Sequence, residues 1–550
     1  MEKRYLLFIC LSILTFCLAA DASNAEAARP CNGRRYSEGD SIVCVCSGTY
    51  CDDLTPIVQG DIPAGQFLSY RSSRSGDRFL AVKGTIQPNG TRQTDDGTDP
   101  TGAVVDAVFT ISNAGSYQSL IGFGGAMTDA AAINIMSLSE AARKSLLDSY
   151  YSETGSEYSV GRVPMASCDF STHVYSYDET PGDFDLKDFK LTTEDLDMKI
   201  PLLKQAQATA KAPLKIFGSV WTAPAWLKTS GRENTSGQLI GQAGDKYHKT
   251  WAQYFVKFVQ SYEAQNVSIW GLTTQNEPID GYIPMFPFQA LGFTPASQRD
   301  FIAKDLGPAL AAANLQHLKL IIMDDQRFLL PNWADTVLAD DTAAGFVDGI
   351  GVHWYFDGLT PASVLTKTHN RHPDKFILST EACQGSGIGQ HKVILGDWSR
   401  GESYAQDIIE NLQNWVGGWV DWNLALNTEG GPNWAKNQVD SPIIVNATAD
   451  EFYKQPMYYA LAHFSKFLPP NSVILKSNLA STTNPWGVKR VSKASGLQIV
   501  AAQRPDGGLV TMVMNKGKKD VTLKVVDGPG GGRSFVVTVQ ARSIQSFVWW

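Results

Sequence analysis

The sequence lacks an excess of positive charge. Its 550 residues include 47 lysine and arginine residues against 55 aspartate and glutamate residues, a net charge of -8. Proteins that bind nucleic acid usually carry a basic patch that neutralises phosphates. We therefore exclude nucleic acid as the main partner. The mild acidity is compatible with work in an acidic compartment.

Several short catalytic motifs are also missing. The chain contains no H-E-x-x-H zinc motif, no G-x-S-x-G nucleophile elbow and no P-loop. Gly122–Gly125 lacks the third glycine of a dinucleotide fingerprint, and we interpret it as a tight path from strand to loop. His353 stands beside two aromatic residues, which favours a hydrogen-bonding pocket residue over a metal ligand. We expect neither a metal nor a cofactor.

Long apolar runs are missing everywhere except at the N-terminus. There, Lys3 and Arg4 precede the apolar run Tyr5–Ala20, which ends in small residues. This pattern predicts a signal peptide over residues 1–25. The run is short for a membrane span, so a signal anchor is the less favoured alternative. The sequence therefore predicts entry into the secretory pathway.

Cysteine is scarce, and half of the eight residues cluster after this segment, at Cys31, Cys44, Cys46 and Cys51. An even cluster in a secreted chain predicts two disulfides, although spacing alone permits three pairings. A zinc site is the alternative, but the Cys44-x-Cys46 spacing does not suit a zinc knuckle. Cys168 and Cys383 are expected to be buried thiols. Sequons that fit the secretory route occur at Asn89, Asn234, Asn266 and Asn446.

Both ends of the chain are rich in predicted strands. Near the N-terminus these are Arg78–Val82 and Ala103–Ile111. Near the C-terminus they are Leu497–Gln503, Leu509–Asn515, Val521–Val526 and Phe535–Val539. Two β-rich ends around a different middle predict one β-domain built from both ends of the chain.

The middle of the chain alternates short apolar strands with longer helical patterns, which is typical of βαβ units. The helical patterns include Asp129–Ser152, Trp251–Gln265 and Pro295–Asn314. The predicted strands are Ile121–Thr128, Val160–Ser167, Lys215–Pro224, Ile269–Pro278, Leu318–Gln326, Gly349–Phe356, Lys375–Ala382 and Trp419–Leu426. Eight such units predict an α/β fold with a (β/α)8 barrel, and a doubly wound open sheet is the alternative.

Two glutamates stand where predicted strands reach the active end of such a barrel. Glu277 ends the fourth strand and Glu381 ends the seventh. A glutamate at the end of an apolar strand is costly to desolvate unless it has a partner or a function. Two carboxyl groups facing one pocket suit cleavage of a glycosidic bond, one as acid and one as nucleophile. The alternative is that the two glutamates only cap or brace loops. This alternative is less favoured for the pair than for either glutamate alone.

Other strand ends supply side chains that suit a sugar pocket. Aspartate and asparagine can bind sugar hydroxyls, and tryptophan can stack on a sugar face. The candidates are Asp169, Trp221, His353, Trp354, Tyr355, Trp422 and Asn423. Arg162, inside the second strand, is expected to be a buried charge partner.

The predicted pair of glutamates carries an expectation about pH. Glu277 must hold a proton to protonate the leaving oxygen, and the negative charge of Glu381 nearby should raise its pKa above the ordinary value of about 4.3. We therefore expect a bell-shaped activity profile with an optimum in mild acid.

Four stretches of the sequence resemble glycoside hydrolase family 30, in particular its lysosomal glucosylceramidases. They are Gly122–Ala132, Arg162–Phe170, Gly418–Asn427 and Glu429–Trp434. The resemblance extends from about Ala28 to near the C-terminus. It implies a (β/α)8 TIM barrel over 118–423 and 450–467, with an all-β sandwich over 57–115 and 470–550. It also implies a small disulfide-bearing β-domain over 28–55, joined in space by about 424–448, with the pairs Cys31–Cys44 and Cys46–Cys51.

The resemblance further implies retaining hydrolysis of glucosylceramide to glucose and ceramide. Position by position, Glu277 matches the family's acid/base and Glu381 matches its nucleophile. Tyr355 matches a residue beside the nucleophile. The positions that match glucose-binding residues are Asp169, Trp221, Asn276, Trp422 and Asn437.

Partners and location also follow from the resemblance. The family's lysosomal members use a saposin-type activator protein and anionic lipids, which implies a luminal, membrane-associated lysosomal enzyme, with secretion as the alternative. The chain departs from the family pattern at Ser47, at Phe286 and in Gln384–Gly389, which lacks aromatic residues. These departures bear on lipid preference and activator dependence. One functional alternative is a β-glucosidase or β-xylosidase that acts on soluble glycosides. The other is a catalytically silent sugar- or lipid-binding barrel, and the presence of both glutamates argues against this second alternative.

Overall fold

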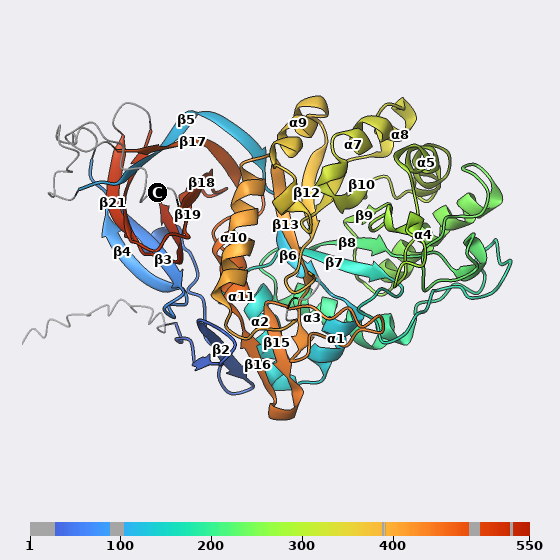
Figure 1. Ribbon diagram of the computed structural model, residues 1–550, viewed down its shortest axis with the longest axis horizontal. Helices are drawn as coiled ribbons and strands as arrows, with labels where there is room; N and C mark the ends of the chain where they lie inside the picture. The colour runs from blue at the N-terminus through green and yellow to red at the C-terminus, as the bar shows by residue number, and fades with distance from the viewer. Residues whose placement is uncertain (1–27, 89–103, 388–389, 391, 483–495, 529–531) are drawn as a thin grey trace, which may run out of the picture.

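The protein is built from an eight-stranded barrel and two β-sheets, as the ribbon of the computed structural model shows (Figure 1). The structure describes residues 28–88, 104–387, 390, 392–482, 496–528 and 532–550. The predicted signal peptide and the sequon at Asn89 lie outside these residues. Among the helices of the described residues, none is both long and apolar enough to cross a membrane.

The predicted barrel is confirmed. All eight strands are parallel, and they close in the order β10-β11-β12-β13-β6-β7-β8-β9. Seven of the predicted strands contain one observed strand each, and the eighth, Trp419–Leu426, overlaps an observed strand that begins three residues earlier, at Val416. Most of the observed strands are shorter than predicted because their polar carboxyl ends form loops around the pocket. Their bounds are β6 Gly122–Ala126, β7 Val160–Met165, β8 Lys215–Val220, β9 Gly271–Thr273, β10 Lys319–Gln326, β11 Gly349–His353, β12 Phe376–Glu381 and β13 Val416–Asn423.

Helices surround the barrel, and two of the predicted helices are divided. Pro295–Asn314 forms two α-helices joined by a π-helical stretch, Ile302–Leu306. Asp129–Ser152 forms two helices, because Ser137 ends the first and the Ser139 hydroxyl accepts a bond from the Ala142 N–H at the start of the second. The bounds are α1 Asp129–Met136, α2 Glu140–Tyr151, α3 Ile200–Thr209, α4 Lys246–Ala264, α5 Pro295–Phe301, α6 Gly307–Ala312, α7 Asn332–Val337, α8 Asp341–Phe346, α9 Ser363–Arg371, α10 Trp398–Leu412 and α11 Pro456–Ser465.

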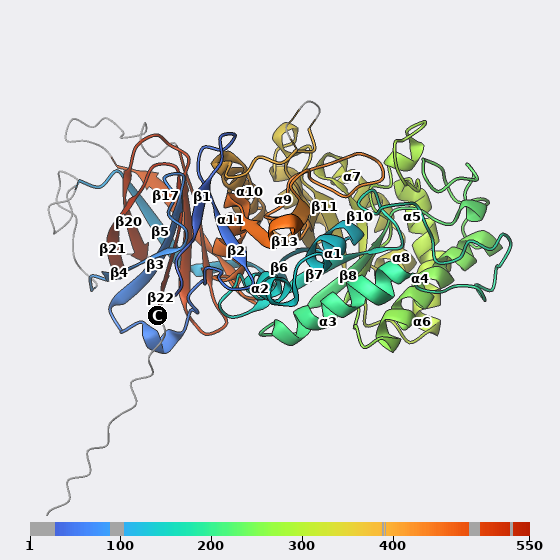
Figure 2. The same cartoon turned by 90° about the horizontal axis from the view of Figure 1, so that it is seen from below.

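Both ends of the chain contribute to a nine-stranded sheet of order β21-β20-β5-β17-β18-β19-β22-β3-β4. The sheet curls on itself, because Gln87, just after β4, bridges to Ser534 in β21, and the Phe67 and Phe535 rings stack 4.3 Å apart. Helices α10 and α11 lie between this sheet and the barrel (Figures 1 and 2). The strands are β3 Gln66–Ser73, β4 Leu80–Thr85, β5 Ala107–Ser119, β17 Val473–Ser481, β18 Leu497–Gln503, β19 Leu509–Asn515, β20 Val521–Asp527, β21 Arg533–Val539 and β22 Ser543–Trp549.

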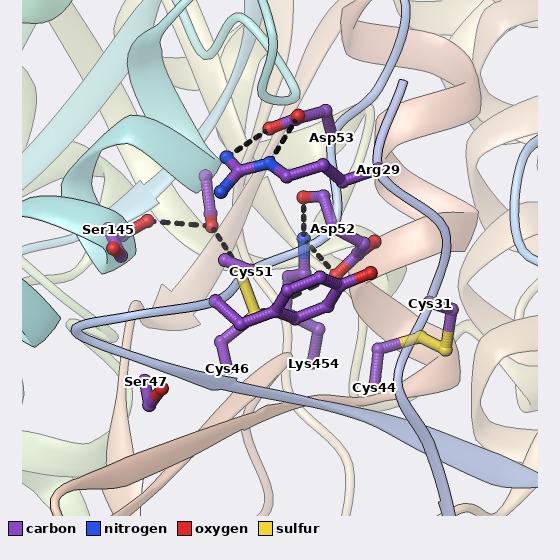
Figure 3. Close-up of a disulfide and its surroundings, with 12 residues drawn as sticks. Arg29, Cys31, Cys44, Cys46, Ser47, Cys51, Asp52, Asp53, Ser145 and Lys454 are labelled. Atoms are coloured by element: carbon purple, nitrogen blue, oxygen red, sulfur yellow. Dashed lines mark hydrogen bonds and ion pairs between the residues drawn. A yellow bond between two sulfur atoms is a disulfide. The ribbon is translucent and has the colours of Figure 1, made fainter. Parts of the chain in front are cut away.

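A smaller sheet carries the disulfides and joins distant parts of the chain. Its five strands are β1 Gly33–Arg35, β2 Ile42–Ser47, β16 Glu451–Lys454, β15 Ile443–Asn446 and β14 Leu426–Asn427. Cys31 is bonded to Cys44 and Cys46 to Cys51 (Figure 3). Beside them, Lys454 forms a buried ion pair with Asp52 at 2.7 Å. Strand β16, which the resemblance assigned to the barrel, pairs with β2 in this sheet.

The structure also places three of the predicted glycosylation sites and the two cysteines outside the disulfides. Asn234 and Asn266 are exposed, while Asn446 is half-buried and its amide donates to the Tyr453 hydroxyl at 2.9 Å. Cys168 and Cys383 are buried and unpaired.

Candidate active site

A cavity opens at the carboxyl ends of the barrel strands. It has a volume of about 590 Å³, within the range common for small-molecule sites. Its polar side is lined by the carboxylates of Glu277 and Glu381 and by neighbouring polar groups. Its outer side is apolar, lined by Ile279, Ile283, Phe286, Phe288, Phe328 and Phe356.

Glu277 and Glu381 meet in this cavity as the sequence predicts. Glu277 follows the short strand β9 in a left-handed backbone conformation, with φ +40°, and Glu381 is the last residue of β12. One carboxylate oxygen of each, and one ring nitrogen of His353, all lie within 4.8 Å of one another. Carboxyl groups about 5–5.5 Å apart are typical of retaining glycosidases, whereas inverting enzymes need about 6.5–9.5 Å to admit a water.

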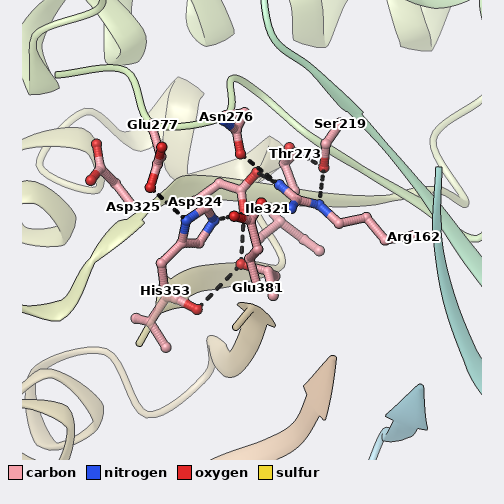
Figure 4. A network of polar contacts seen from close by, with 12 residues as sticks. Arg162, Ser219, Thr273, Asn276, Glu277, Ile321, Asp324, Asp325, His353 and Glu381 are labelled. Carbon is pink, nitrogen blue, oxygen red and sulfur yellow. Dashed lines mark hydrogen bonds and ion pairs between the residues drawn. The ribbon is translucent and has the colours of Figure 1, made fainter. Parts of the chain in front are cut away.

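Arg162 organises the floor of the cavity from strand β7. Its side chain is fully buried and pairs with Glu381 and, at 2.9 Å, with Asp324. It also donates to the side-chain oxygen Oδ1 of Asn276 at 2.8 Å and to the Ser219 hydroxyl at 3.0 Å. In Figure 4 the guanidinium of Arg162 and the imidazole of His353 flank Asp324. Arg162 is thus the buried charge partner that the sequence predicts.

Glu381 is held by two different donors. The guanidinium of Arg162 binds Oε2, and the Tyr355 hydroxyl donates to Oε1 at 2.7 Å. Both donors stabilise the charged carboxylate, which is the form a nucleophile needs. Only 7% of the Glu381 side chain is exposed, so the charge is directed at the cavity rather than at bulk water.

Glu277 is held by groups that can titrate. Oε1 of Glu277 accepts bonds from Gln326 Nε2 at 2.7 Å and from His353 Nδ1 at 3.0 Å. The other ring nitrogen of His353 lies 3.0 Å from Asp324. Burial alone would lower the pKa of His353, but Glu381, Asp324 and Glu277 raise it well above its ordinary value. The raised pKa and the two facing carboxylates favour the protonated ring.

The expectation that the pKa of Glu277 is raised is wrong for this residue by itself. Burial favours the neutral acid, but the hydrogen bond and charge of His353, with a further hydrogen bond from Asp280, lower the pKa of Glu277. The pKa values of two neighbouring carboxyl groups shift in the opposite direction. Burial, together with the charge of Glu277, raises the pKa of Asp280 to about 10 and that of Asp325 to about 8.

The predicted sugar-binding residues gather around the same floor. Trp221 and Trp422 stack with ring centres 5.0 Å apart, and Arg162 lies over both rings. Asn437 donates to Asp169 at 3.1 Å. Burial and the charge of Glu381 raise the pKa of Asp169 to about 7.

Asn276 alone among these residues is buried beneath the cavity rather than on its lining. Arg162 binds its carbonyl oxygen, which leaves its amide N–H groups at the opposite end of the side chain for another acceptor. The structure therefore brings all six predicted binding residues to one site, five of them on the cavity wall.

Glu277, His353 and Glu381 are close enough together to be considered as metal ligands. Both ring nitrogens of His353 face carboxylates and its pKa is raised, so neither nitrogen has a lone pair for a cation. The other such group among the described residues, Cys46, Cys51 and Asp52, includes a disulfide. Glu277, His353 and Glu381 therefore suit proton transfer rather than metal binding.

Sequence reasoning missed three residues at the end of strand β10, namely Asp324, Asp325 and Gln326. A bulge between Met323 and Asp325 and left-handed φ angles at Met323 and Asp324 turn these side chains around the pocket. The same signal that identified Glu277 was present, since polar residues follow the apolar run Leu320–Met323 at a strand's carboxyl end. Asp280, in the loop after Glu277, carried no such signal.

Comparison with known proteins agrees with this geometry. Residues 120–468 match the model of the glycosyl hydrolase family 30 TIM-barrel domain, and residues 487–547 match that of the family 30 beta sandwich domain. The chain is 47% identical to lysosomal acid glucosylceramidase of Mus musculus over 541 residues, which cover 98% of this chain and 99% of the relative. It is 42% identical to putative glucosylceramidase 4 of Caenorhabditis elegans over 99% of this chain and 100% of the relative.

A solved structure, SrfJ from Salmonella typhimurium, has the same fold. It superposes with a TM-score of 0.76 at 24% identity and covers 88% of this chain and 99% of its own. The two family models and the two close relatives decide the assignment: the chain belongs to glycoside hydrolase family 30 and is a glycoside hydrolase.

Proposed function

We propose that the protein is a retaining β-glucosidase that hydrolyses glucosylceramide, with Glu381 as nucleophile and Glu277 as acid/base. The observation that supports this best is the separation of the two carboxylates, which line one cavity and each bring an oxygen within 4.8 Å of the other. The names of the mouse and nematode relatives support the substrate.

In the first step, a carboxylate oxygen of Glu381 attacks the anomeric carbon as the bond to the leaving oxygen breaks. The electron pair of that bond goes to the leaving oxygen, which takes a proton from Glu277. Ceramide then departs as an alcohol. Arg162 and Tyr355 hold Glu381 in place for this attack.

In the second step, water enters between Glu277 and the anomeric carbon. Formation of the ester has removed the charge of Glu381, so Glu277 can take a proton from the water. The hydroxyl adds to the anomeric carbon, the ester bond breaks, and Glu381 is restored as a carboxylate. One glycoside and one water thus give glucose and ceramide.

The rim of the cavity fits a lipid aglycone. Ile283, Phe328 and Phe356 line it and are 46%, 44% and 46% exposed. Met285 and Leu359, close to them in sequence, are 88% and 83% exposed. Large apolar side chains gathered at one opening are unfavourable in water unless a ligand or membrane covers them. Ceramide chains emerging from a lipid surface are such a ligand.

Activation and location complete the proposal. We propose that the enzyme works in the lysosomal lumen at the membrane surface, with anionic lipids and a saposin-type activator protein presenting the substrate. The name of the mouse relative and the apolar rim support this. The test is binding to vesicles with and without anionic lipid, with Met285→Ser/Leu359→Ser as the variant expected to bind more weakly.

The decisive experiment measures glucose release from glucosylceramide vesicles and from soluble β-glucosides and β-xylosides. We expect glucosylceramide to have the highest kcat/KM, with a further increase from anionic lipid. A preference for a soluble glycoside would reject the lipid substrate. No hydrolysis of any β-glycoside would reject the enzyme, and Glu381→Gln provides the inactive control.

A further inference from the structure

Gln289 is a buried glutamine that joins three segments around the catalytic cavity. It lies in the loop between β9 and α5. Its side-chain nitrogen Nε2 donates to the Ser167 hydroxyl at 3.0 Å and to the carbonyl oxygen of Cys168 at 3.1 Å. Its side-chain oxygen Oε1 accepts a hydrogen bond from Trp434 Nε1 at 3.1 Å. One amide thus connects its own loop to the end of β7 and to the segment that follows β14.

The neighbours of Gln289 fix the orientation of its amide. A backbone carbonyl oxygen only accepts hydrogen bonds, so the N–H groups of the amide must face Cys168. An indole nitrogen only donates, so the amide oxygen must face Trp434. A side chain that lacks either a donor end or an acceptor end cannot make this set of bonds. The site therefore calls for an amide of this length.

The contacts of Gln289 lie directly behind two predicted sugar-binding residues. Cys168 precedes Asp169, which lines the cavity. Trp434 also donates to the carbonyl oxygen of Cys168, at 3.0 Å. Three residues after Trp434, the side chain of Asn437 donates to Asp169 at 3.1 Å. Gln289 therefore closes a ring of contacts that contains both Asp169 and Asn437.

The loop that carries Gln289 is also held by bonds on either side of this residue. The Thr235 hydroxyl donates to the carbonyl oxygen of Phe286 at 3.1 Å, and Lys228 Nζ donates to that of Ala290 at 3.0 Å. Phe286 belongs to the apolar side of the cavity. Loss of the Gln289 side chain alone would leave these two bonds in place. The effect of such a change should therefore fall on the sugar side of the cavity rather than on its apolar side.

We propose that Gln289 is a positioning residue that sets the places of Asp169 and Asn437 for the sugar. It acts through the backbone of Cys168 and the indole of Trp434, and it lies behind the residues that line the cavity. The inference rests on the proposed function, because it takes the glucose to lie against Asp169 and Asn437. It adds a residue that neither of the two catalytic glutamates contacts in the proposed mechanism.

The test compares Gln289→Leu with the wild type on glucosylceramide and on an aryl glucoside, which share the glucose and differ in the leaving group. Leucine has a similar size but makes none of the three bonds. We expect kcat/KM to fall by about 10–100-fold on both substrates, because misplaced sugar contacts slow the reaction whatever the leaving group is. The affinity for deoxynojirimycin, an amine with the shape of glucose, should fall by at least about tenfold in calorimetry.

Gln289→Glu is a second variant that tests the donor end of the amide. An ionised glutamate would place an acceptor against the carbonyl oxygen of Cys168, whereas a protonated one can donate to it. Burial favours the neutral acid, so the variant should work best at low pH. We expect the ratio of its kcat/KM to that of the wild type to fall by at least about tenfold between about pH 5 and pH 8. A ratio near one throughout would overturn the proposal.

Gln118→Leu is the matched control. The Gln118 amide donates to the carbonyl oxygens of Leu412 and Val416, both at 2.8 Å, at the amino end of β13 and so at the opposite end of the barrel from the cavity. This variant should lower the temperature of thermal unfolding and leave kcat/KM and the affinity for deoxynojirimycin unchanged.

Three results would overturn the proposal. The first is a Gln289→Leu variant that keeps kcat/KM and the affinity for deoxynojirimycin within about twofold of the wild type. The second is an equal loss in Gln118→Leu, which would reveal a general effect of stability. The third is a loss confined to glucosylceramide, which a role on the apolar side of the cavity predicts. Failure of the wild type to hydrolyse either substrate would instead reject the proposed function.

Discussion

The two sides of the catalytic cavity hold the same residue type by different means. On the nucleophile side, Glu381 is bonded to Arg162, whose charge is permanent, and to the Tyr355 hydroxyl. On the side of the proposed acid/base, Glu277 accepts hydrogen bonds from His353, which can gain or lose a proton, and from Gln326. The chemistry needs a fixed negative charge on one side and a movable proton on the other.

This difference explains why two glutamates can have two roles within 4.8 Å of each other. A guanidinium does not titrate in proteins, so Arg162 presents a permanent positive charge to Glu381. A cluster of acids and an imidazolium stores protons and exchanges them, as coupled groups do. The role of each glutamate is therefore set by its partners, which come from other strands.

The strongest test of the comparison is Glu381→Gln. The amide has nearly the same shape but is a poor nucleophile, so we expect turnover to fall by at least about 10⁴-fold while the fold remains intact. Thermal unfolding checks the fold, and mass spectrometry after treatment with a fluorosugar inactivator should find the label on Glu381 of the wild type. Label on another carboxyl group, or near-normal turnover of the variant, would contradict the assignment.

Glu277→Gln should have a smaller effect that depends on the leaving group. Loss of acid assistance is expected to reduce kcat/KM for glucosylceramide by about 10²–10⁴-fold. The first step with an activated aryl glucoside should be far less affected, and the alkaline limb of its profile should disappear. If the variant keeps that limb in the first step, Glu277 is not the acid.

The sequence predicted those site residues that a local pattern of apolar and polar residues marks, and it did not predict the contacts between them. Glu277 and Glu381 were identified because apolar strands end at them, a local pattern that the barrel converts into a shared location. Arg162 was identified as a buried charge because it interrupts an apolar strand. Its partners on β10 and β12 were not predicted, since strand neighbours are set by closure of the barrel.

Other features were beyond local patterns. The lowered pKa of Glu277 follows from His353 and Asp280, whose contacts with it depend on a bulge in β10 and a turn after β9. The sequence suggested only the repulsion from Glu381 and gave the opposite direction. Likewise β16 joined the small sheet through pairing with β2, about 400 residues earlier in the chain, which no local periodicity indicates.

A stability measurement separates a permanent ion pair from a neutral donor. Arg162→Met leaves Glu381 and Asp324 buried without their cation, and we expect it to lower the free energy of unfolding by about 3–5 kcal/mol. Gln326→Leu removes only one amide donor from Glu277 and should cost about 1–3 kcal/mol. Urea unfolding at one pH measures both. Equal losses would show that the two sides are held in the same way.

The acids of the cavity also contribute to the dependence of folding stability on pH. The pKa values of Asp169, Asp325 and Asp280 are raised to about 7, 8 and 10. The unfolded chain releases these protons near pH 4, so the folded state binds more protons from there up to each raised value. Stability must therefore fall as pH rises through this window, by up to about 1.4 kcal/mol per unit for each fully buried group.

The pairing of His353, whose pKa is also raised, is fully present below about pH 6.5 and is lost only above it. Burial lowers the pKa of His463 to about 3, so its contribution to stability is lost as pH falls below about 6.5, and Asp324 loses its ion pairs only in strong acid.

The raised acids outnumber His463, so we expect the free energy of unfolding in urea to be larger at pH 5 than at pH 8. Asp325→Asn should make the dependence shallower, since the amide carries no proton that folding must retain. A protein more stable at pH 8 than at pH 5 would show that these carboxyl groups are ionised in the folded state, and the proton store on the acid/base side would then not exist.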